Sequence, residues 1–261
     1  MRIALGLSYD GAAFSGWQTQ PQGTGVQDAV EQAIRAFTNG PAASWCAGRT
    51  DAGVHACAQV IHVDTLADRD VASWVRGLNA LLPRAVNVQW AQPVSTQFNA
   101  RFAALSREYT YVLLTHPVRP THLRQLCGWS FRRLDAALMQ AAAQCLVGSH
   151  DFSAFRSAQC QAASPIRTIE SINVLQRGNL LITHIQGNAF LHHMVRNIMG
   201  SLVQVGQGKW PPQKMAAVLA SRDRRTNART FEAAGLYLTA VNYPPQFGLP
   251  IGCACPPWWQ L

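Results

Sequence analysis

The residues with the clearest capacity for chemistry lie in the segment CAGRTDAGVHA, where Arg49 and Asp51 are two positions apart. Gly48 and Gly53 flank the pair, and glycines permit backbone conformations that direct a side chain away from a regular strand. A nearby guanidinium favours the ionised form of a carboxylate. An ionised, positioned carboxylate can act as a nucleophile or a base, although the same two residues could also brace a turn.

A second candidate is Arg196, in the segment FLHHMVRNIMGSLVQV, whose apolar residues recur at helical spacing over residues 189–205. A charge near the apolar stripe of a helix is costly unless it is paired or faces solvent, so we expect a carboxylate partner. His192 and His193 should lie on the same helix and point in different directions, which makes a shared metal ion improbable.

The charge balance indicates a polyanionic partner. The chain has 22 Lys and Arg against 13 Asp and Glu, a net charge of +9, and nearly all of the basic residues are arginine. Arginine suits RNA because its planar fork binds phosphate and stacks on bases, although GC-rich coding would also favour arginine. One cluster in the segment SRDRRTNART is a candidate for phosphate contact, with a solvated helix end as the alternative, and consists of Arg222, Arg224, Arg225 and Arg229.

Cysteine usage and hydropathy point to a soluble, cytoplasmic protein. The seven cysteines lack the spacing of a disulfide framework, and Cys253 with Cys255 forms a C-x-C without a second ligand pair, so we expect no metal. No apolar stretch approaches the roughly 18 residues of a membrane helix. The first residues also lack the pattern of a signal peptide.

The elements that must position these residues alternate between strands and helices. The first hundred residues predict a strand at 3–9, a helix from Val26 to about Asn39 after a Thr24–Gln27 capping box, a strand at 59–65 and a helix at 71–81. The rest predicts a strand at 107–114, a helix at 136–147 capped by Asp135, a hairpin of residues 167–175 and 179–187, and the helix at 189–205. This order predicts an α+β fold of largely antiparallel sheet flanked by helices, divided into domains 1–105 and 106–261.

Six collinear motifs resemble the tRNA pseudouridine synthase I family. They are YDGAAFSGWQTQ at 9–20, GRTDAGVHACAQ at 48–59, FNARFAALSREYTY at 98–111, GSHDFSAF at 148–155, FLHHMVRNIMGSLVQVGQG at 190–208 and AAGLYL at 233–238. The resemblance implies two pseudouridine synthase-like domains with a catalytic cleft between them. It also implies a homodimer that isomerises uridines 38–40 in the anticodon arm of tRNA.

The same resemblance implies roles for individual residues. Asp51 corresponds to the catalytic aspartate, and Arg196 to the basic residue that pairs with it. Tyr109 corresponds to the tyrosine that packs against the target base, and Leu236 to an apolar residue near the flipped base.

Two arginines keep several roles open. Arg49 could pair with Asp51, contact a phosphate or extrude the base. Arg101, in the FNAR element, is a candidate for RNA contact or for a buried structural pairing.

The implied chemistry needs no cofactor, because the base is detached from the sugar, turned and rejoined without redox change or a group donor. The carboxylate could attack the sugar, attack the base or remove a sugar proton, and the sequence leaves all three routes open. The uridine must first leave the RNA stack, which costs about a few kcal/mol and is offset by basic contacts to the backbone.

Two other classes of function compete with the enzyme. A non-catalytic RNA-binding module or RNA chaperone would use the same basic surface and would not depend on Asp51. A metal-dependent nuclease would need a carboxylate cluster, and the DRD at 68–70 is better explained as the start of a helix.

Overall fold

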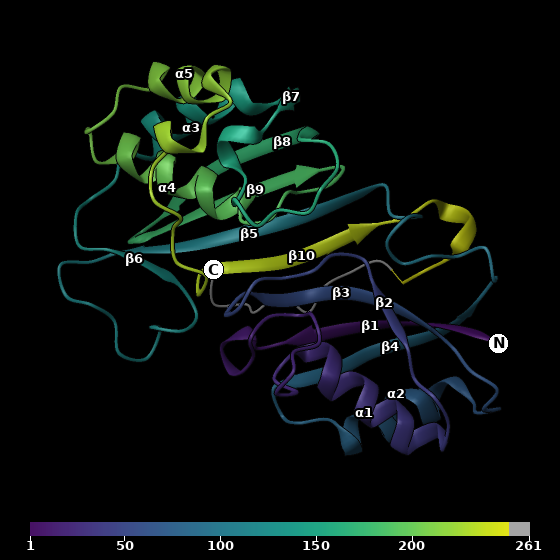
Figure 1. Ribbon diagram of the computed structural model, residues 1–261. Helices are drawn as coiled ribbons and strands as arrows, with labels where there is room; N and C mark the ends of the chain where they lie inside the picture. Colours follow the sequence, from purple (N-terminus) through teal and green to yellow (C-terminus); the bar gives the residue numbers. More distant parts are fainter. Residues whose placement is uncertain (251–261) are drawn as a thin grey trace. The chain divides into compact units, whose positions relative to one another are not determined.

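The computed structural model describes residues 1–250, which form two compact units (Figure 1). The first unit is Met1–Arg107 together with the described residues from Tyr237 onward, and the second is Glu108–Leu236. Residues 237–250, which the sequence analysis assigned to the second domain, therefore belong with the first unit. The C-x-C of Cys253 and Cys255 lies outside the described residues.

The first unit is a sheet with two helices packed on it (Figure 1). Its strands run in the order β4-β1-β3-β10, with β2 added beside β3. β10 is parallel to β3, pairing Tyr237 with His55, and the other pairs are antiparallel. The elements are β1 Arg2–Tyr9, α1 Val26–Thr38, β2 Ser44–Cys46, β3 His55–Asp64, α2 Val71–Leu81, β4 Val86–Val94 and β10 Leu236–Asn242.

Helix α1 is built as its sequence predicts, except at its first turn. Val26, Val30 and Ile34 are buried at the spacing of one helix face, and Asn39 ends the helix in a left-handed conformation with φ 51°. The capping prediction was one residue off, because the Gly25 amide donates to Asp28 Oδ2 at 2.9 Å.

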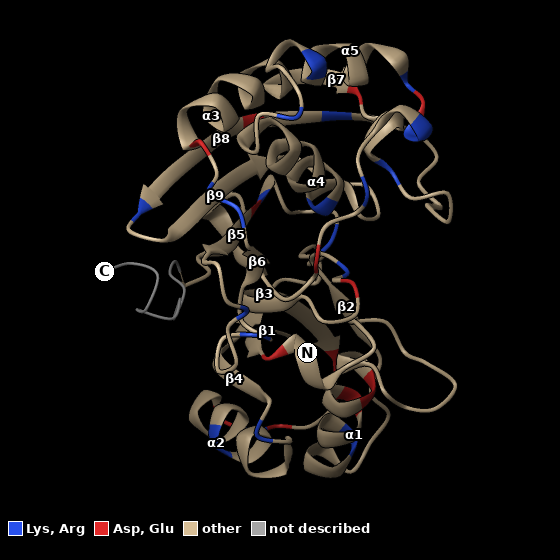
Figure 2. Ribbon diagram, turned by 90° about the vertical axis from the view of Figure 1, so that its left-hand side faces the viewer, with Lys and Arg blue, Asp and Glu red and all other residues tan. Residues whose placement is uncertain are grey.

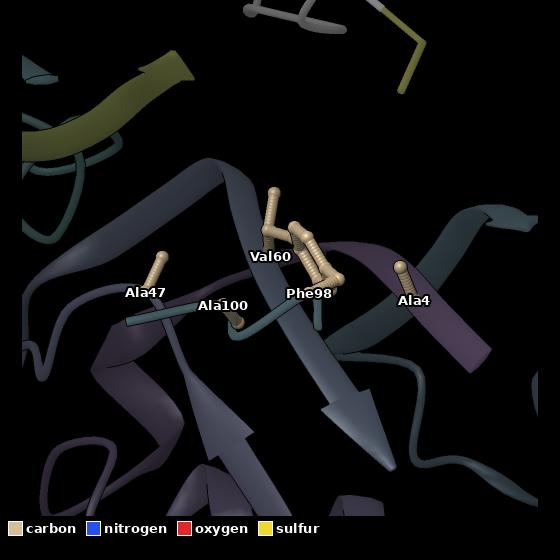
Figure 3. Close-up of a cluster of buried hydrophobic side chains, with 5 residues drawn as sticks. All are labelled: Ala4, Ala47, Val60, Phe98 and Ala100. Atoms are coloured by element: carbon tan, nitrogen blue, oxygen red, sulfur yellow. The ribbon is translucent and has the colours of Figure 1, made fainter. Parts of the chain in front are cut away.

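One core cluster of the first unit gathers around Phe98 (Figure 3). The small side chains of Ala4, Ala47 and Ala100 leave room for this ring, which is fully buried with Val60 beside it. Burial of such a ring stabilises the fold by about 2–3 kcal/mol, and the ring also meets Phe247 edge-on at 5.1 Å. The segment after β10 is thereby packed into the first unit.

The second unit has strands in the order β5-β9-β8-β7, with β6 parallel to β5. The predicted hairpin is confirmed as the antiparallel pair of β8 and β9, joined at Gly178 with φ 57°. The elements are β5 Ser106–Thr115, which begins in the last residues of the first unit, then β6 Gly128–Ser130, α3 Ala136–Ala143, β7 Gly148–Asp151, β8 Ile166–Arg177, β9 Leu180–Gly187, α4 Met194–Gly206 and α5 Gln213–Ser221. Short 3-10 turns occur at Gly11–Ala13, Gln144–Leu146, Ser153–Phe155, Arg224–Thr226 and Pro245–Phe247.

Both units confirm the α+β class with largely antiparallel strands. Asp135 caps α3 as predicted, by accepting from the Leu138 amide at 3.0 Å, but the α-helix ends at Ala143 rather than near 147. Helix α4 begins at Met194, five residues later than predicted, and β4 and α5 were not predicted. Within residues 1–250, the helices are all too short or too polar to span a membrane.

Candidate active site

The loop between β2 and β3 carries Asp51 and is pinned by buried polar groups of the first unit. Thr50, next to Asp51, bonds through Oγ1 to the Tyr9 hydroxyl at 2.8 Å, and its carbonyl accepts from the Trp17 amide at 3.0 Å. Fully buried Gln59 donates to the Gly48 carbonyl at 2.6 Å. Since buried polar groups are costly to leave unpaired, these bonds fix the loop backbone on the N-terminal side of Asp51.

A tight turn fixes the other side of Asp51. The Val54 amide donates to the Asp51 carbonyl at 3.1 Å, and Gly53 adopts φ 76°, which favours glycine. Gly16 lies against the turn, where a Cβ would be only 2.9 Å from the Thr50 carbonyl oxygen. Asp51 is half-buried and Arg49 exposed, on either side of buried Thr50. The backbone therefore presents the carboxylate from a defined position.

Arg107 is a structural residue of this region that the sequence reasoning missed. It is 8% exposed, and its Nε and Nη2 donate to the Ala47 carbonyl at 3.2 and 2.9 Å. Its Nη2 also donates to the Arg101 carbonyl at 2.6 Å, whereas the Arg101 side chain is exposed over the Phe102 ring. The buried structural pairing that was considered for Arg101 is thus made by Arg107 instead. The sequence feature that could have indicated this is the position of Arg107 within the predicted strand 107–114.

The neighbouring thiol is a poor nucleophile. Burial raises the pKa of Cys46 to about 12, although the positive charge of Arg49 opposes the shift. A thiol with so high a pKa is protonated at neutral pH and is therefore unreactive. Asp51 stays the candidate side chain of this loop.

In the second unit, Tyr109 lies on β5 and is 8% exposed. The Phe190 ring meets it edge-on, with ring centroids 5.1 Å apart and planes at 80°. Edge-to-face packing of this kind restricts the orientation of both rings.

Arg196 lies in the first turn of α4, a helix buried on nearly all sides. Every residue of α4 except Arg196 and Gln204 is buried. Arg196 Nε donates to the Phe231 carbonyl at 2.9 Å, and the Phe231 amide donates to the Arg196 carbonyl at 3.1 Å. The guanidinium is therefore held in a fixed position in the first turn of α4, where Arg196 is only half-buried.

The segment 231–236 connects Arg196 with Leu236. The Val112 amide donates to the Gly235 carbonyl at 2.8 Å, and a Cβ on Gly235 would lie 2.4 Å from the Val112 carbonyl oxygen. Leu236 is 4% exposed, and its amide donates to the Ala233 carbonyl at 2.9 Å. The structure thus joins two of the predicted site residues, Arg196 and Leu236, through one closely packed segment of the second unit.

The two histidines before α4 correct the sequence analysis. They lie outside the helix: His193 is its N-cap with φ 64°, and the two rings are 4.0 Å apart with planes at 40°. The helical geometry that was expected to separate the rings does not apply, because the helix starts one residue later. The His192 carbonyl accepts from the Ser157 amide at 2.9 Å.

The four arginines of residues 221–230 occupy different environments. Arg222 ends α5 and approaches Asp151 at 3.5 Å with a side chain 70% exposed, and Arg225 is 91% exposed with an ion pair to Asp223 at 2.8 Å. Arg229 is exposed. In Figure 2 the basic residues, drawn blue, are spread over the elements of the second unit rather than gathered on one helix.

Arg224 differs from the other three because it is half-buried in a polar network. It donates to Asn197 Oδ1 at 3.1 Å, to Thr230 Oγ1 at 3.2 Å and to the Ala228 carbonyl at 2.8 Å. Fully buried Asn197 in turn donates to the Phe155 carbonyl at 2.7 Å. Arg224 therefore ties α4 to the segment before Phe231.

The sequence matches the family model described as tRNA pseudouridine synthase over residues 7–103 and 142–244. It is 55% identical to the tRNA pseudouridine synthase A of Bordetella parapertussis over 249 residues, which cover 95% of this chain and 92% of that protein. The protein of the same name from Thiobacillus denitrificans is 54% identical over 250 residues, 96% of either chain. Among solved structures, the match to one chain of a Cbf5–Nop10–Gar1 complex covers 90% of this chain and 48% of that chain, with a TM-score of 0.39 and 11% sequence identity.

Proposed function

Because this chain belongs to the tRNA pseudouridine synthase family, we propose that it converts uridines 38–40 of the tRNA anticodon arm into pseudouridine, with Asp51 as its catalytic carboxylate. Its class of reaction is that of the family, an isomerisation within tRNA. The observation that carries the assignment of Asp51 is the GRTDAG loop, whose backbone is fixed on both sides of that residue.

The reaction needs positioning more than it needs reagents. The N1–C1′ bond of uridine breaks and a C5–C1′ bond forms, while C5 loses a proton and N1 gains one, so atoms and electrons balance without a cofactor. A carboxylate can serve by attacking the sugar, by attacking the base or by removing a sugar proton, and the proposal holds for each route.

Three further residues have proposed roles in the same reaction. Arg196 is the ionic partner that keeps the catalytic carboxylate charged, a role that suits a guanidinium already fixed by Phe231. Tyr109 packs on one face of the detached base, and Leu236 provides an apolar wall, so that the base stays in place while it turns. A detached base that diffused away would end the reaction unproductively.

Exposed arginines bind the phosphates of the RNA substrate. Arg49, Arg101, Arg222 and Arg229 are exposed and suited to phosphate contact, whereas the exposed Arg225 already pairs with Asp223. Arg224 is not assigned to RNA, because its guanidinium is engaged in the network with Asn197. We also propose a homodimer in the cytoplasm, where tRNA is processed and cysteines such as buried Cys57 and Cys127 stay reduced.

The test is a position-resolved map of pseudouridine in an unmodified tRNA transcript with a chelator present. The native protein should modify positions 38–40, and Asp51→Asn should lower turnover by more than about a thousandfold with RNA binding retained. Asp68→Asn, at an exposed carboxylate in the loop before α2, is the matched control and should turn over normally. RNA binding with no product from the native protein would instead support the RNA-binding module.

A further inference from the structure

A pocket of about 510 Å³ lies in the second unit beside β6. Its volume lies within the range of about 300–1,000 Å³ typical of sites for small ligands and single nucleotides. It is lined by Arg119, Pro120, Arg124, Gln125, Trp129 and Glu232. Five of these six residues fall between the two segments that match the family model, so the family match does not describe this pocket.

Backbone and side-chain bonds hold the indole that lines the pocket. Trp129 Nε1 donates to the His116 carbonyl at 2.8 Å, and the His116 amide donates to the Ser130 carbonyl at 3.0 Å. These bonds close the base of the loop between β5 and β6. The Trp129 ring is half-buried and therefore offers a fixed, partly open aromatic surface.

Further aromatic and basic side chains lie next to the Trp129 ring. Phe131 is 58% exposed with its centroid 6.4 Å from that of Trp129, and the Arg132 guanidinium lies 5.3 Å from the Phe131 centroid. Aromatic rings interleaved with arginines are typical of surfaces that bind unpaired nucleotides, since bases stack on the rings and phosphates pair with the guanidinium groups.

The two arginines of the pocket are available for an anion. Arg119 and Arg124 are exposed, and within residues 1–250 neither forms a hydrogen bond or ion pair with a protein group. Arg225 shows the contrast, because its guanidinium is already neutralised by Asp223 at 2.8 Å. Two guanidinium groups on one pocket, neither of them in an ion pair with a residue of the described range 1–250, fit a phosphate group.

The pocket adjoins the segment that holds Arg196. Glu232 lines the pocket and directly follows Phe231, whose carbonyl accepts from Arg196 Nε at 2.9 Å. The Glu232 carbonyl itself accepts from the Tyr111 hydroxyl at 2.8 Å, which fixes this part of the segment on β5. Because Glu232 is the residue after Phe231, the pocket adjoins the segment of the second unit that holds Arg196.

We infer that this pocket binds a nucleotide of the RNA substrate that neighbours the target uridine, with its phosphate on Arg119 and Arg124 and its base against Trp129. The Glu232 carboxylate can accept a hydrogen bond from an amino or imino group of that base. The inference deepens the proposed function and depends on it for the identity of the RNA. It assigns the β5–β6 loop to substrate binding.

The test measures binding of a labelled RNA stem-loop with the sequence of the anticodon arm. The double variant Arg119→Gln with Arg124→Gln should lose about tenfold or more in affinity at about 0.1 M salt, and the slope of log K against log salt should fall by about 1.4–1.8. Trp129→Leu should lose about fivefold or more without the same change of slope, because stacking is not electrostatic.

The matched control removes the same charge elsewhere. Arg76→Gln with Arg84→Gln changes two exposed arginines, in and just after α2, and should alter the affinity by less than about twofold. Equal losses in the two double variants, with equal salt slopes, would overturn the inference. Because all four arginines are exposed, the double variants should keep the native circular dichroism and melting temperature.

Turnover separates this inference from the proposed function. If the native protein forms pseudouridine, the Arg119/Arg124 variant should show KM raised about tenfold and kcat within about twofold, since a remote contact serves binding. If the native protein forms pseudouridine and the variant has unchanged KM and RNA affinity, the inference about the pocket is wrong and the proposed function stands. Specific loss of binding with no product from the native protein would sink the proposed function and leave the pocket as an RNA site.

Discussion

Arg196 and Phe231 are joined in both directions, by a side-chain bond of 2.9 Å from Nε to the Phe231 carbonyl and a backbone bond of 3.1 Å from the Phe231 amide to the Arg196 carbonyl. The reciprocal pair locks the guanidinium to a segment that lies apart from α4 in the sequence. The backbone bond fixes the distance between the two segments, and the side-chain bond is made in only one rotamer. The arginine side chain therefore has one strongly favoured orientation.

Replacement of this arginine by lysine should keep the charge and lose the orientation. Lysine has no Nε donor to reach the Phe231 carbonyl and no planar fork. We expect Arg196→Lys to lower kcat/KM for tRNA by about 10- to 100-fold, which corresponds to the loss of about 1.5–3 kcal/mol in charge-assisted hydrogen bonding. Steady-state kinetics would check this, with exposed Arg84→Lys as the control; native kinetics for Arg196→Lys would refute the role of orientation.

Two adjacent arginines should differ sharply in their effect on stability. Arg224→Ala removes three hydrogen bonds around Asn197 and should cost about 2 kcal/mol, or a melting temperature lower by about 4–8 °C. Arg225→Ala removes only an ion pair of an exposed side chain and should change the melting temperature by less than about 2 °C. Thermal unfolding followed by circular dichroism compares the two, and equal shifts would contradict the structural role of Arg224.

The stability of the first unit should fall in mild acid because of His62. Burial, assisted by the positive charge of Arg2, lowers the pKa of His62 from 6.5 to about 4, and its Nδ1 accepts from the Ala100 amide at 3.1 Å. The unfolded chain then binds more protons than the folded one between these values. This contribution to stability is fully present above about pH 6.5 and is lost as the pH falls toward about 4, a loss of about 3 kcal/mol.

The variant His62→Gln isolates this contribution from other titrations. The introduced amide oxygen could still accept a hydrogen bond from the Ala100 amide, but the side chain would not titrate. The change of melting temperature between about pH 7 and pH 4 should therefore be smaller in His62→Gln than in the native protein. Parallel curves for the native protein and the variant would show that His62 does not carry the pH dependence.

Gly235 should tolerate no side chain. A Cβ there would lie 2.4 Å from the Val112 carbonyl oxygen and 2.6 Å from the Gly128 amide nitrogen, both backbone atoms that cannot rotate away. Gly235→Ala should therefore destabilise the protein by about 2 kcal/mol or more, measured by urea unfolding. Gly40→Ala is the control, since the nearest atom to its Cβ would be 3.8 Å away; equal midpoints for the two variants would contradict the close approach.

Much of the fold followed from local patterns in the sequence. The alternation of residues 3–9 and the helical spacing of Val26, Val30 and Ile34 report side chains that face a core, which is why β1 and α1 lie where they were predicted. The five residues before α4 were included in the predicted helix because Phe190 fits the same apolar spacing. The conformation of His193, with φ 64°, is set by contacts beyond that window.

The candidate site was less accessible from sequence alone. The GRTDAG motif could be recognised in the sequence. The hydrogen bonds that fix its backbone come from Tyr9 and Gln59, on two different strands, and a local sequence pattern does not predict such long-range pairs. Arg107 resembled an ordinary strand residue in the sequence, and its burial depends on the carbonyl groups of residues 47, 101 and 104. Arg224 was indistinguishable from its neighbours in a basic run until its partner Asn197 was placed.

The pairing of β10 with β3 has a consequence for synthesis of the chain. The strand that covers this edge of the first unit includes Tyr237 and Leu238, which pair with residues 55 and 56. When residues 1–107 have been synthesised, the start of β3 at residues 55 and 56 still lacks its β10 partner, and about half of the polypeptide must follow before that partner exists. During that interval an uncovered strand edge is open to wrong partners, so prompt completion of translation protects the nascent protein from aggregation.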